Sequence, residues 1–218
     1  MKTKALLISA LLYLACLSPV WASDYIPDIL DLDGSNGLSF PPNSTLTLRG
    51  GGTIEFWVVP DWKTDPGYEP VIISNTGEQG PSYLVAMLPN KQGLVVYSGN
   101  KRLEAAFDFT DGQMHFVAVV DFGDTLNILI DNRLIAAGEM TLVDLPSSGF
   151  FIGTADGERY PFVGAIAGLR VWDIPLDPYT LIEFAMKNIE HSSNTHPDID
   201  YLLGLSRFRT QSFYLYGM

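Results

Sequence analysis

The fold is decided by one stretch of the chain, which reads VGAIAGLRVWDIPLDP at residues 163–178. Its large apolar and β-branched residues are typical of a strand, and Gly164 and Gly168 leave room for closely packed backbones. A turn then passes the chain to a helix, because Asp177 is a good N-cap and Pro178 suits the first helical position. A strand of this kind late in the chain fits a two-sheet β-sandwich.

The predicted helix has an apolar side. Leu176, which precedes the cap, is placed to pack against Leu181 one turn into the helix. Further apolar residues repeat at helical spacing and predict a stripe that covers an edge or mouth of the sandwich. The residues of this stripe are Ile182, Ala185, Met186 and Ile189.

Short apolar runs separated by turn residues fill the rest of the chain. Side chains alternate along a strand, so Ile54, Phe56 and Val58 share one face. Asn132 tolerates the left-handed conformation that a two-residue turn requires. Many short strands at this spacing predict a sandwich or barrel. The predicted strands cover residues 29–33, 38–40, 45–48, 53–59, 71–74, 82–87, 93–97, 114–120, 125–130, 133–137 and 149–153.

The N-terminal residues have the pattern of a secretory signal. Lys2 and Lys4 precede an apolar run at residues 5–17, and Ala22 supplies a small residue at the expected cleavage point. The other 196 or so residues suit one all-β domain. We therefore expect a secreted or periplasmic protein. Its parts would be a signal peptide at residues 1–22, a sandwich at residues 23–190, and a C-terminal tail at residues 191–218 packed on the sandwich.

Cysteine content and charge exclude several classes of function. Cys16 is the only cysteine and lies inside the signal, so the mature domain has no disulfide, thiolate nucleophile or Cys-type zinc site. Tyr13 is bulky for a lipoprotein signal, which favours plain secretion over lipid anchoring at Cys16. The net charge of −12 repels phosphate backbones, so nucleic acid is not an expected partner. No segment beyond the signal is apolar enough to span a membrane.

The motifs also follow a recognisable order. They are ILDLDG at 29–34, TIEFWV at 53–58, HFVAV at 115–119, the turn at 131–132, and the Ile-Gly pair at 152–153 before the stretch at 163–178. This order resembles the concanavalin A-like laminin G and pentraxin group across roughly residues 28 to 190. The resemblance implies an antiparallel jelly roll of about a dozen strands, whose members bind carbohydrates or proteins, often with calcium. Met114 and Asn132 depart from the family pattern, which often has Trp and Gly there.

The resemblance also implies where calcium would bind. Pentraxins hold calcium with an acidic loop after the Ile-Gly strand, and the matching loop here covers residues 154–159. Asp156 and Glu158 are its acids, and Arg159 opposes them. Glu78, in the loop after residues 71–74, is a further candidate ligand, since calcium takes six to eight oxygens. Calcium is thus a candidate cofactor, with Asp156, Glu158 and Glu78 as its ligands.

The sequence gives no positive sign of catalysis. The glucanases of this superfamily carry Glu-x-Asp-x-x-Glu on one strand, because hydrolysis needs two carboxylates beside the scissile bond. That run does not occur, and Glu55 stands alone in its strand. His115 lies in an apolar strand and is expected to be structural, while His191 and His196 lie in a polar loop. A glycoside hydrolase with widely separated carboxylates stays an alternative.

Aromatic residues are the best indication of a ligand. The loop DWKTDPGY at residues 61–68 carries Trp62 and Tyr68, and a sugar ring can stack on such aromatic faces. We expect Trp62 to be less buried than Trp57 or Trp172, although it would alternatively anchor the loop by packing into the core.

The sequence therefore predicts a secreted, non-catalytic, carbohydrate-binding or adhesive module with Trp62 and Tyr68 as ligand contacts. The alternative is a component of an extracellular assembly that binds another protein through the tail after Glu190.

Overall fold

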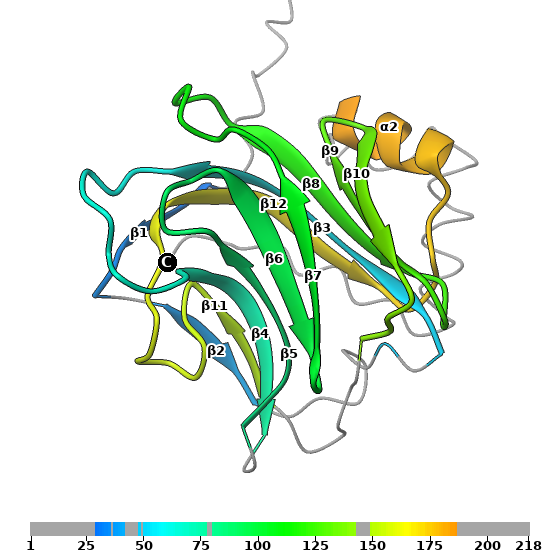
Figure 1. The fold of residues 1–218 in the computed structure, drawn as a ribbon, viewed down its shortest axis with the longest axis horizontal. Helices are drawn as coiled ribbons and strands as arrows, with labels where there is room; N and C mark the ends of the chain where they lie inside the picture. Colours follow the sequence, from blue (N-terminus) through cyan, green and yellow to red (C-terminus); the bar gives the residue numbers. More distant parts are fainter. Residues whose placement is uncertain are drawn as a thin grey trace, which may run out of the picture.

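The chain folds into two six-stranded antiparallel sheets stacked face to face (Figure 1). The computed structural model describes residues 29–35, 37–41, 48, 50–77, 80–142 and 149–186. The first sheet has the spatial order β1 (Ile29–Asp33), β12 (Val163–Trp172), β3 (Gly52–Pro60), β8 (His115–Asp121), β9 (Leu126–Ile130) and β10 (Arg133–Gly138). The second has the order β2 (Leu38–Phe40), β11 (Gly149–Ile152), β4 (Val71–Gly77), β5 (Gly80–Met87), β6 (Gly93–Ser98) and β7 (Lys101–Ala106). The predicted antiparallel sandwich is confirmed.

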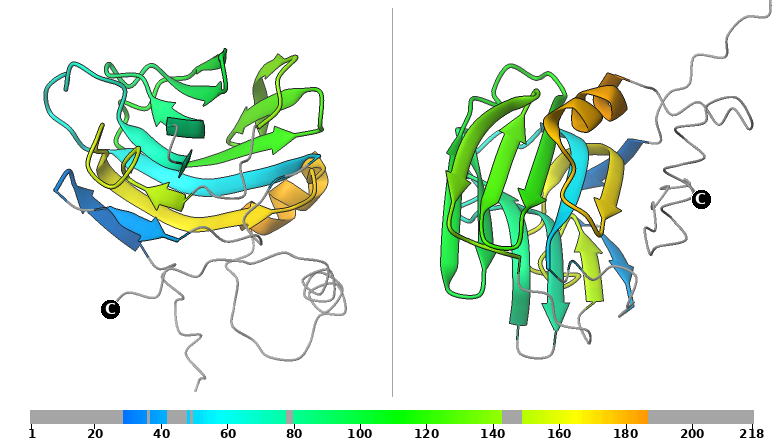
Figure 2. Two further views of the ribbon diagram at one scale, coloured as in Figure 1. Left: turned by 90° about the horizontal axis from the view of Figure 1, so that it is seen from below. Right: turned by 90° about the vertical axis from the view of Figure 1, so that its right-hand side faces the viewer.

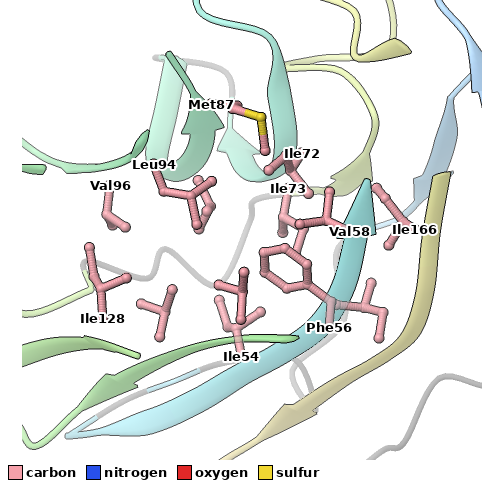
Figure 3. Packing of buried hydrophobic residues seen from close by; sticks show 14 of the residues in the cluster. Ile54, Phe56, Val58, Ile72, Ile73, Met87, Leu94, Val96, Ile128 and Ile166 are labelled. Carbon is pink, nitrogen blue, oxygen red and sulfur yellow. The ribbon is translucent and has the colours of Figure 1, made fainter. Parts of the chain in front are cut away.

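Alternating apolar side chains from both sheets meet in the core (Figure 3). Ile54, Phe56 and Val58 of β3 are fully buried and form one cluster with residues of β4 and β5. A β-bulge between Val71 and Ile73 interrupts the alternation of β4, and Ile72 and Ile73 are both buried in this cluster. Burial of this kind contributes about 25 cal/mol for each Å² of apolar surface removed from water.

A short helix, α2 (Pro178–Met186), lies against the outer face of the first sheet (Figure 2). The Asp177 carboxylate accepts the backbone N–H groups of Tyr179 and Thr180 at 2.9 and 3.2 Å, which is N-cap geometry. Leu176 and Leu181 are buried together against β8 and β9. The predicted cap and staple are therefore present.

The predicted apolar stripe of this helix is wrong at Ile182, whose side chain is 40% exposed. Leu181 occupies the buried position instead. Successive residues lie about 100° apart around a helix, so the staple that buries Leu181 turns its neighbour toward water. The side chains of residues 183–186, and Ile189, lie outside what the structure describes.

The edge of the second sheet contains a strand that the sequence pattern did not indicate. In β7, Leu103 and Ala105 pack toward the core while Arg102 and Glu104 are exposed. Charged side chains on an edge strand discourage pairing with another chain. The predicted run at 45–48 is described only at Leu48, which is buried.

Two features of the backbone agree with the sequence. Asn132 has φ 61°, so the turn between β9 and β10 is left-handed as predicted. Gly164 has φ 144°, and a Cβ there would lie 2.2 Å from the carbonyl oxygen of Val59, so β12 needs glycine where it approaches β3.

The signal peptide at 1–22 and the tail at 191–218 lie outside the described residues and stay predictions. Within the described ranges, no helix has the length and apolar character needed to cross a bilayer.

Candidate functional site

The outer face of the second sheet carries a cavity of about 440 Å³. Its floor is apolar because Val71 of β4, and Leu84 and Ala86 of β5, turn away from the core and pack with Val95 and Ala155. The volume falls in the range of small-molecule sites, which run from about 300 to 1,000 Å³. The lining residues are Tyr68, Glu69, Val71, Pro81, Ser82, Tyr83, Leu84, Ala86, Tyr97, Ser98, Gly99 and Tyr160.

Three tyrosines that are at least partly exposed surround this floor, whereas the fourth tyrosine of the lining, Tyr83, is buried in the core. Tyr68 and Tyr160 come from two different loops, which lie on the same side of the molecule in Figures 1 and 2. Their ring centroids are 5.8 Å apart with the planes tilted by 50°. The Tyr68 hydroxyl donates to the carbonyl oxygen of Pro161 at 3.2 Å, and the Tyr160 side chain is 47% exposed. The cavity therefore presents an aromatic wall with one ring open to solvent.

The third tyrosine belongs to a charged network. The Tyr97 hydroxyl donates to Glu69 Oε2 at 2.7 Å, and Arg102 Nε donates to the same hydroxyl at 3.0 Å. Arg102 also contacts Glu104 Oε2 at 2.7 Å and Glu69 Oε1 at 3.4 Å. Partial burial and the bond to Glu69 raise the pKa of Tyr97 and outweigh the effect of Arg102. Tyr97 thus stays protonated and holds Glu69 at the rim.

The loop between β11 and β12 is fastened to the sheet by hydrogen bonds. The hydroxyls of Ser74 and Thr76 both donate to the carbonyl oxygen of Ala155. The N–H of Val71 donates to the carbonyl oxygen of Tyr160 at 2.9 Å. Tyr160 has φ 55°, a conformation that a bulky residue adopts only when its surroundings hold it there. These bonds hold the loop backbone that carries the Tyr160 ring at the mouth of the cavity.

Asp156, a predicted calcium ligand, organises the same loop. Its Oδ1 accepts the N–H groups of Glu158 and Arg159 at 3.3 and 2.9 Å, and its Oδ2 pairs with the Arg159 guanidinium. Partial burial raises the pKa of Asp156, but the hydrogen bonds from Arg159 and Glu158 outweigh it and hold the pKa below its ordinary value.

Glu158 contacts Asp156 through its backbone N–H, and no described contact joins the two carboxylates. Glu158 is exposed, and Glu78 lies outside the described residues. Within the described part of the chain, no three acids, histidines or cysteines are grouped closely enough to hold a metal ion.

The expectation that Trp62 is less buried than Trp57 is wrong, whereas Trp172, which is 6% exposed, is slightly more buried than Trp62. Trp62 is 9% exposed, whereas Trp57 is only partly buried. The Trp62 indole N–H donates to the carbonyl oxygen of Pro89 at 2.8 Å, and its ring meets Phe162 edge to face at 5.6 Å. The hydrogen bond to Pro89 and the packing on Phe162 keep the Trp62 side chain in the core. Trp62 therefore anchors the loop, which was the alternative interpretation. Its predicted partner Tyr68 lines the cavity, and Trp62 does not.

Sequence reasoning missed Tyr97, Tyr160 and Glu69. The alternation of β6 gives a signal for Tyr97, because Leu94 and Val96 face the core and leave Tyr97 on the opposite face. Tyr160 carries no such signal, since only the folded loop brings it beside Tyr68.

The remaining titratable candidates lie elsewhere. His115 contacts Asp131 at 2.8 Å and Asp111 at 3.1 Å through its two ring nitrogens, which confirms a structural histidine. Glu55 is fully buried and pairs with Arg170 at 2.9 Å. Neither residue lines the cavity.

Comparisons with solved structures find a similar sandwich in several other proteins. The carbohydrate-binding module CBM40 of the Ruminococcus gnavus IT-sialidase has a TM-score of 0.58 at 15% identity, covering 73% of this chain and 97% of that one. Domain 4 of AbnA, a GH43 extracellular arabinanase from Geobacillus stearothermophilus, gives 0.56 at 18%, covering 72% and 75%. The heptameric SAP-like pentraxin from Limulus polyphemus gives 0.54 at 15%, covering 70% and 79%. At these identities the likeness is one of fold.

The sequence itself matches a laminin G family model. No curated protein matches the chain significantly. Residues 32–180, well over half of the chain, match the model described as the concanavalin A-like lectin/glucanases superfamily. The family expected from the order of the motifs is therefore confirmed, and the chain belongs to the laminin G branch of the concanavalin A-like lectin/glucanase superfamily.

Proposed function

We propose that this protein is a non-catalytic carbohydrate-binding module whose site is the cavity on the outer face of the second sheet. The observation that carries the proposal is the meeting of Tyr68, Tyr97 and Tyr160 around an apolar floor. Sugars present flat apolar faces edged by hydroxyls, and such aromatic walls with a few fixed polar groups are suited to them.

Two structural neighbours support the choice of ligand class. The CBM40 module is known bound to α2,3-sialyllactose, and the AbnA domain is known in complex with arabinotriose. One of these glycans carries a carboxylate and the other is neutral. The neighbours therefore favour a glycan without deciding its charge.

The charge pattern of the cavity favours binding over hydrolysis. Glycosidases use two carboxyl groups on either side of the scissile bond. Among the described residues that line the cavity, Glu69 alone carries a carboxyl group, and that group is occupied by Tyr97 and Arg102. We therefore propose that the module holds a glycan and leaves its bonds intact.

The role of Tyr160 provides the direct test. We expect Tyr160→Asn to raise the Kd for a glycan selected on an array of neutral and acidic oligosaccharides about tenfold or more, because the exposed ring is lost. Asn adopts positive φ readily, so the loop backbone keeps its conformation. The matched control is Tyr179→Asn, which removes a tyrosine that is 85% exposed on α2.

The measurement is isothermal titration calorimetry with the selected glycan. Equal affinities for the wild type and both variants would show that any sugar binds elsewhere. A glycan array with no binder would remove the carbohydrate proposal itself.

Calcium assistance and an extracytoplasmic location remain proposals. If calcium binds at the predicted loop, millimolar calcium raises the melting temperature of the wild type above the effect of equal magnesium, and Asp156→Asn abolishes that rise. The asparagine keeps Oδ1 as an acceptor for the two loop N–H groups and removes the charge. Identical melting curves with and without calcium would eliminate the site.

A further inference from the structure

We infer that the cavity is specific for neutral glycans and rejects acidic ones, an inference that rests on the proposed function of the same site. The first reason is the charge of the lining. Among the twelve described residues around the cavity, the one group that is charged at neutral pH is the carboxylate of Glu69. No lysine, arginine or histidine of the described chain lines it.

Arg102, the cation that contacts the lining residues Tyr97 and Glu69, is paired with acceptors of the protein. Each nitrogen of the Arg102 guanidinium has an acceptor, namely the Tyr97 hydroxyl for Nε, Glu104 for Nη1 and Glu69 for Nη2. The guanidinium also lies over the Tyr97 ring, with 5.6 Å to the centroid. Its charge is thus paired with two carboxylates, whose combined charge exceeds that of Arg102 by one unit.

The loop that carries Tyr160 has a similar arrangement of charges. Arg159, which precedes the exposed Tyr160, is paired with Asp156, and Glu158 adds a second acid. Hydrogen bonding to Asp156 raises the pKa of Arg159, so the pair stays ionised. Both rims therefore carry net negative charge, as does the whole chain at −12.

These charges decide between the two kinds of ligand. The carboxylate of a bound acidic sugar would lose hydration, and no described lysine, arginine or histidine lines the cavity to replace the lost water. It would also approach the acidic groups around the cavity, Glu69 with Glu104 and Asp156 with Glu158. Their repulsion would discriminate against an acidic ligand. A neutral sugar has hydroxyls that donate to the remaining lone pairs of Glu69 and lie on the tyrosine faces without such a cost.

The test uses pairs of oligosaccharides in which one member is neutral and the other is acidic. Lactose with sialyllactose, and galacto-oligosaccharides with oligogalacturonates of the same length, are titrated into the full mature protein in low salt. We expect the neutral member of a binding pair to have a Kd at least about tenfold lower. Added salt should narrow the difference, because screening weakens the repulsion.

Tyr160→Asn separates failure of this inference from failure of the proposed function. If the acidic member binds as well as the neutral one or better, and Tyr160→Asn weakens that binding, the site holds glycans and the claim of neutrality is overturned. If no pair binds, or Tyr160→Asn changes nothing, the proposed function fails and the inference fails with it.

A second variant tests the cause. Glu104→Gln removes one partner of Arg102 without altering the cavity lining, and should shift the acidic-to-neutral affinity ratio severalfold toward the acidic glycan. Asp124→Asn makes the same change of charge in the turn between β8 and β9, on the other sheet. Equal shifts in both variants would assign the selectivity to net charge alone and overturn the role of Arg102.

Discussion

At the scale of single residues, His115 shows how one side chain is held by charge in an apolar setting. Its ring lies edge on to Phe107 and Phe109, while its two nitrogens contact Asp131 and Asp111. Burial lowers the pKa of His115, but the two carboxylates raise it by more, so the folded pKa lies above the ordinary 6.5. The protonated ring therefore stabilises the fold.

This pKa fixes the sign of a pH dependence. A raised folded pKa gives stability that is complete below the unfolded value near 6.5 and is lost as pH rises through the folded value. Asp111→Asn should lower the free energy of unfolding most at about pH 5.5 and least above the folded pKa of His115. Asp111 itself stays ionised across this range, because hydrogen bonds from Gln113 and His115 hold its pKa low.

Urea unfolding at several pH values measures the effect, and Asp124→Asn in an exposed turn is the matched control. A difference between the wild type and Asp111→Asn that grew with pH would contradict the assignment of the raised pKa to these carboxylates.

Residue-level prediction from the sequence succeeded where local chemistry decides and failed where the tertiary fold decides. The structural role of His115 followed from its apolar strand. Trp62 was misplaced because Pro89 and Phe162, which bury it, are distant in sequence. Tyr160 was missed for the same reason, since its partner Tyr68 lies in another loop.

At the scale of elements, α2 depends on its first turn. Asp177 accepts two backbone N–H groups and a bond from the Thr180 hydroxyl. We expect Asp177→Ala to lower the free energy of unfolding by about 1 kcal/mol, the usual cost of losing an N-cap. Asp177→Asn keeps the acceptor and should cost only a few tenths of that, through the lost charge at the helix N-terminus.

Chemical denaturation followed by far-ultraviolet circular dichroism gives both values. Equal losses for Ala and Asn would show that the charge, rather than the hydrogen bond, begins the helix.

Most strands and the helix were predictable, because the spacing of apolar residues that defines them is a local property of the sequence. Residues 53–59 alternate clearly and form β3, and the cap and staple at residues 176–181 were legible before the structure. The strand β7 was missed, since its apolar members Leu103 and Ala105 are short of β-branched character and sit among charges. The prediction for α2 was wrong at Ile182 because the packing of the helix on the sheet determines which of its faces is buried.

At the scale of the whole molecule, one core joins both sheets. Ile54 of β3 and Ile73 of β4 are fully buried in the same cluster. Ile54→Val and Ile73→Val should each cost about 0.5 to 1.5 kcal/mol and each lower a single, shared unfolding midpoint. Ile29→Val makes the same change at a side chain that is 47% exposed and should be nearly neutral.

Within each variant, tryptophan fluorescence and circular dichroism should give the same unfolding midpoint as each other. Separate midpoints for the two probes, or a second transition in one variant only, would mean that the sheets unfold independently.

The hydrogen bonds to the carbonyl oxygen of Ala155 have a consequence for ligand binding. Two hydroxyls and one strand N–H hold the loop of residues 153–162 against the sheet. The cavity is therefore formed before a ligand binds. If a sugar binds as proposed, the protein needs little reordering, and most of the entropic cost of binding falls on the sugar. Crystals of the ligand-free protein should accordingly tolerate soaking with an oligosaccharide. The backbones of residues 153–162 in the ligand-free and ligand-bound structures should superimpose closely.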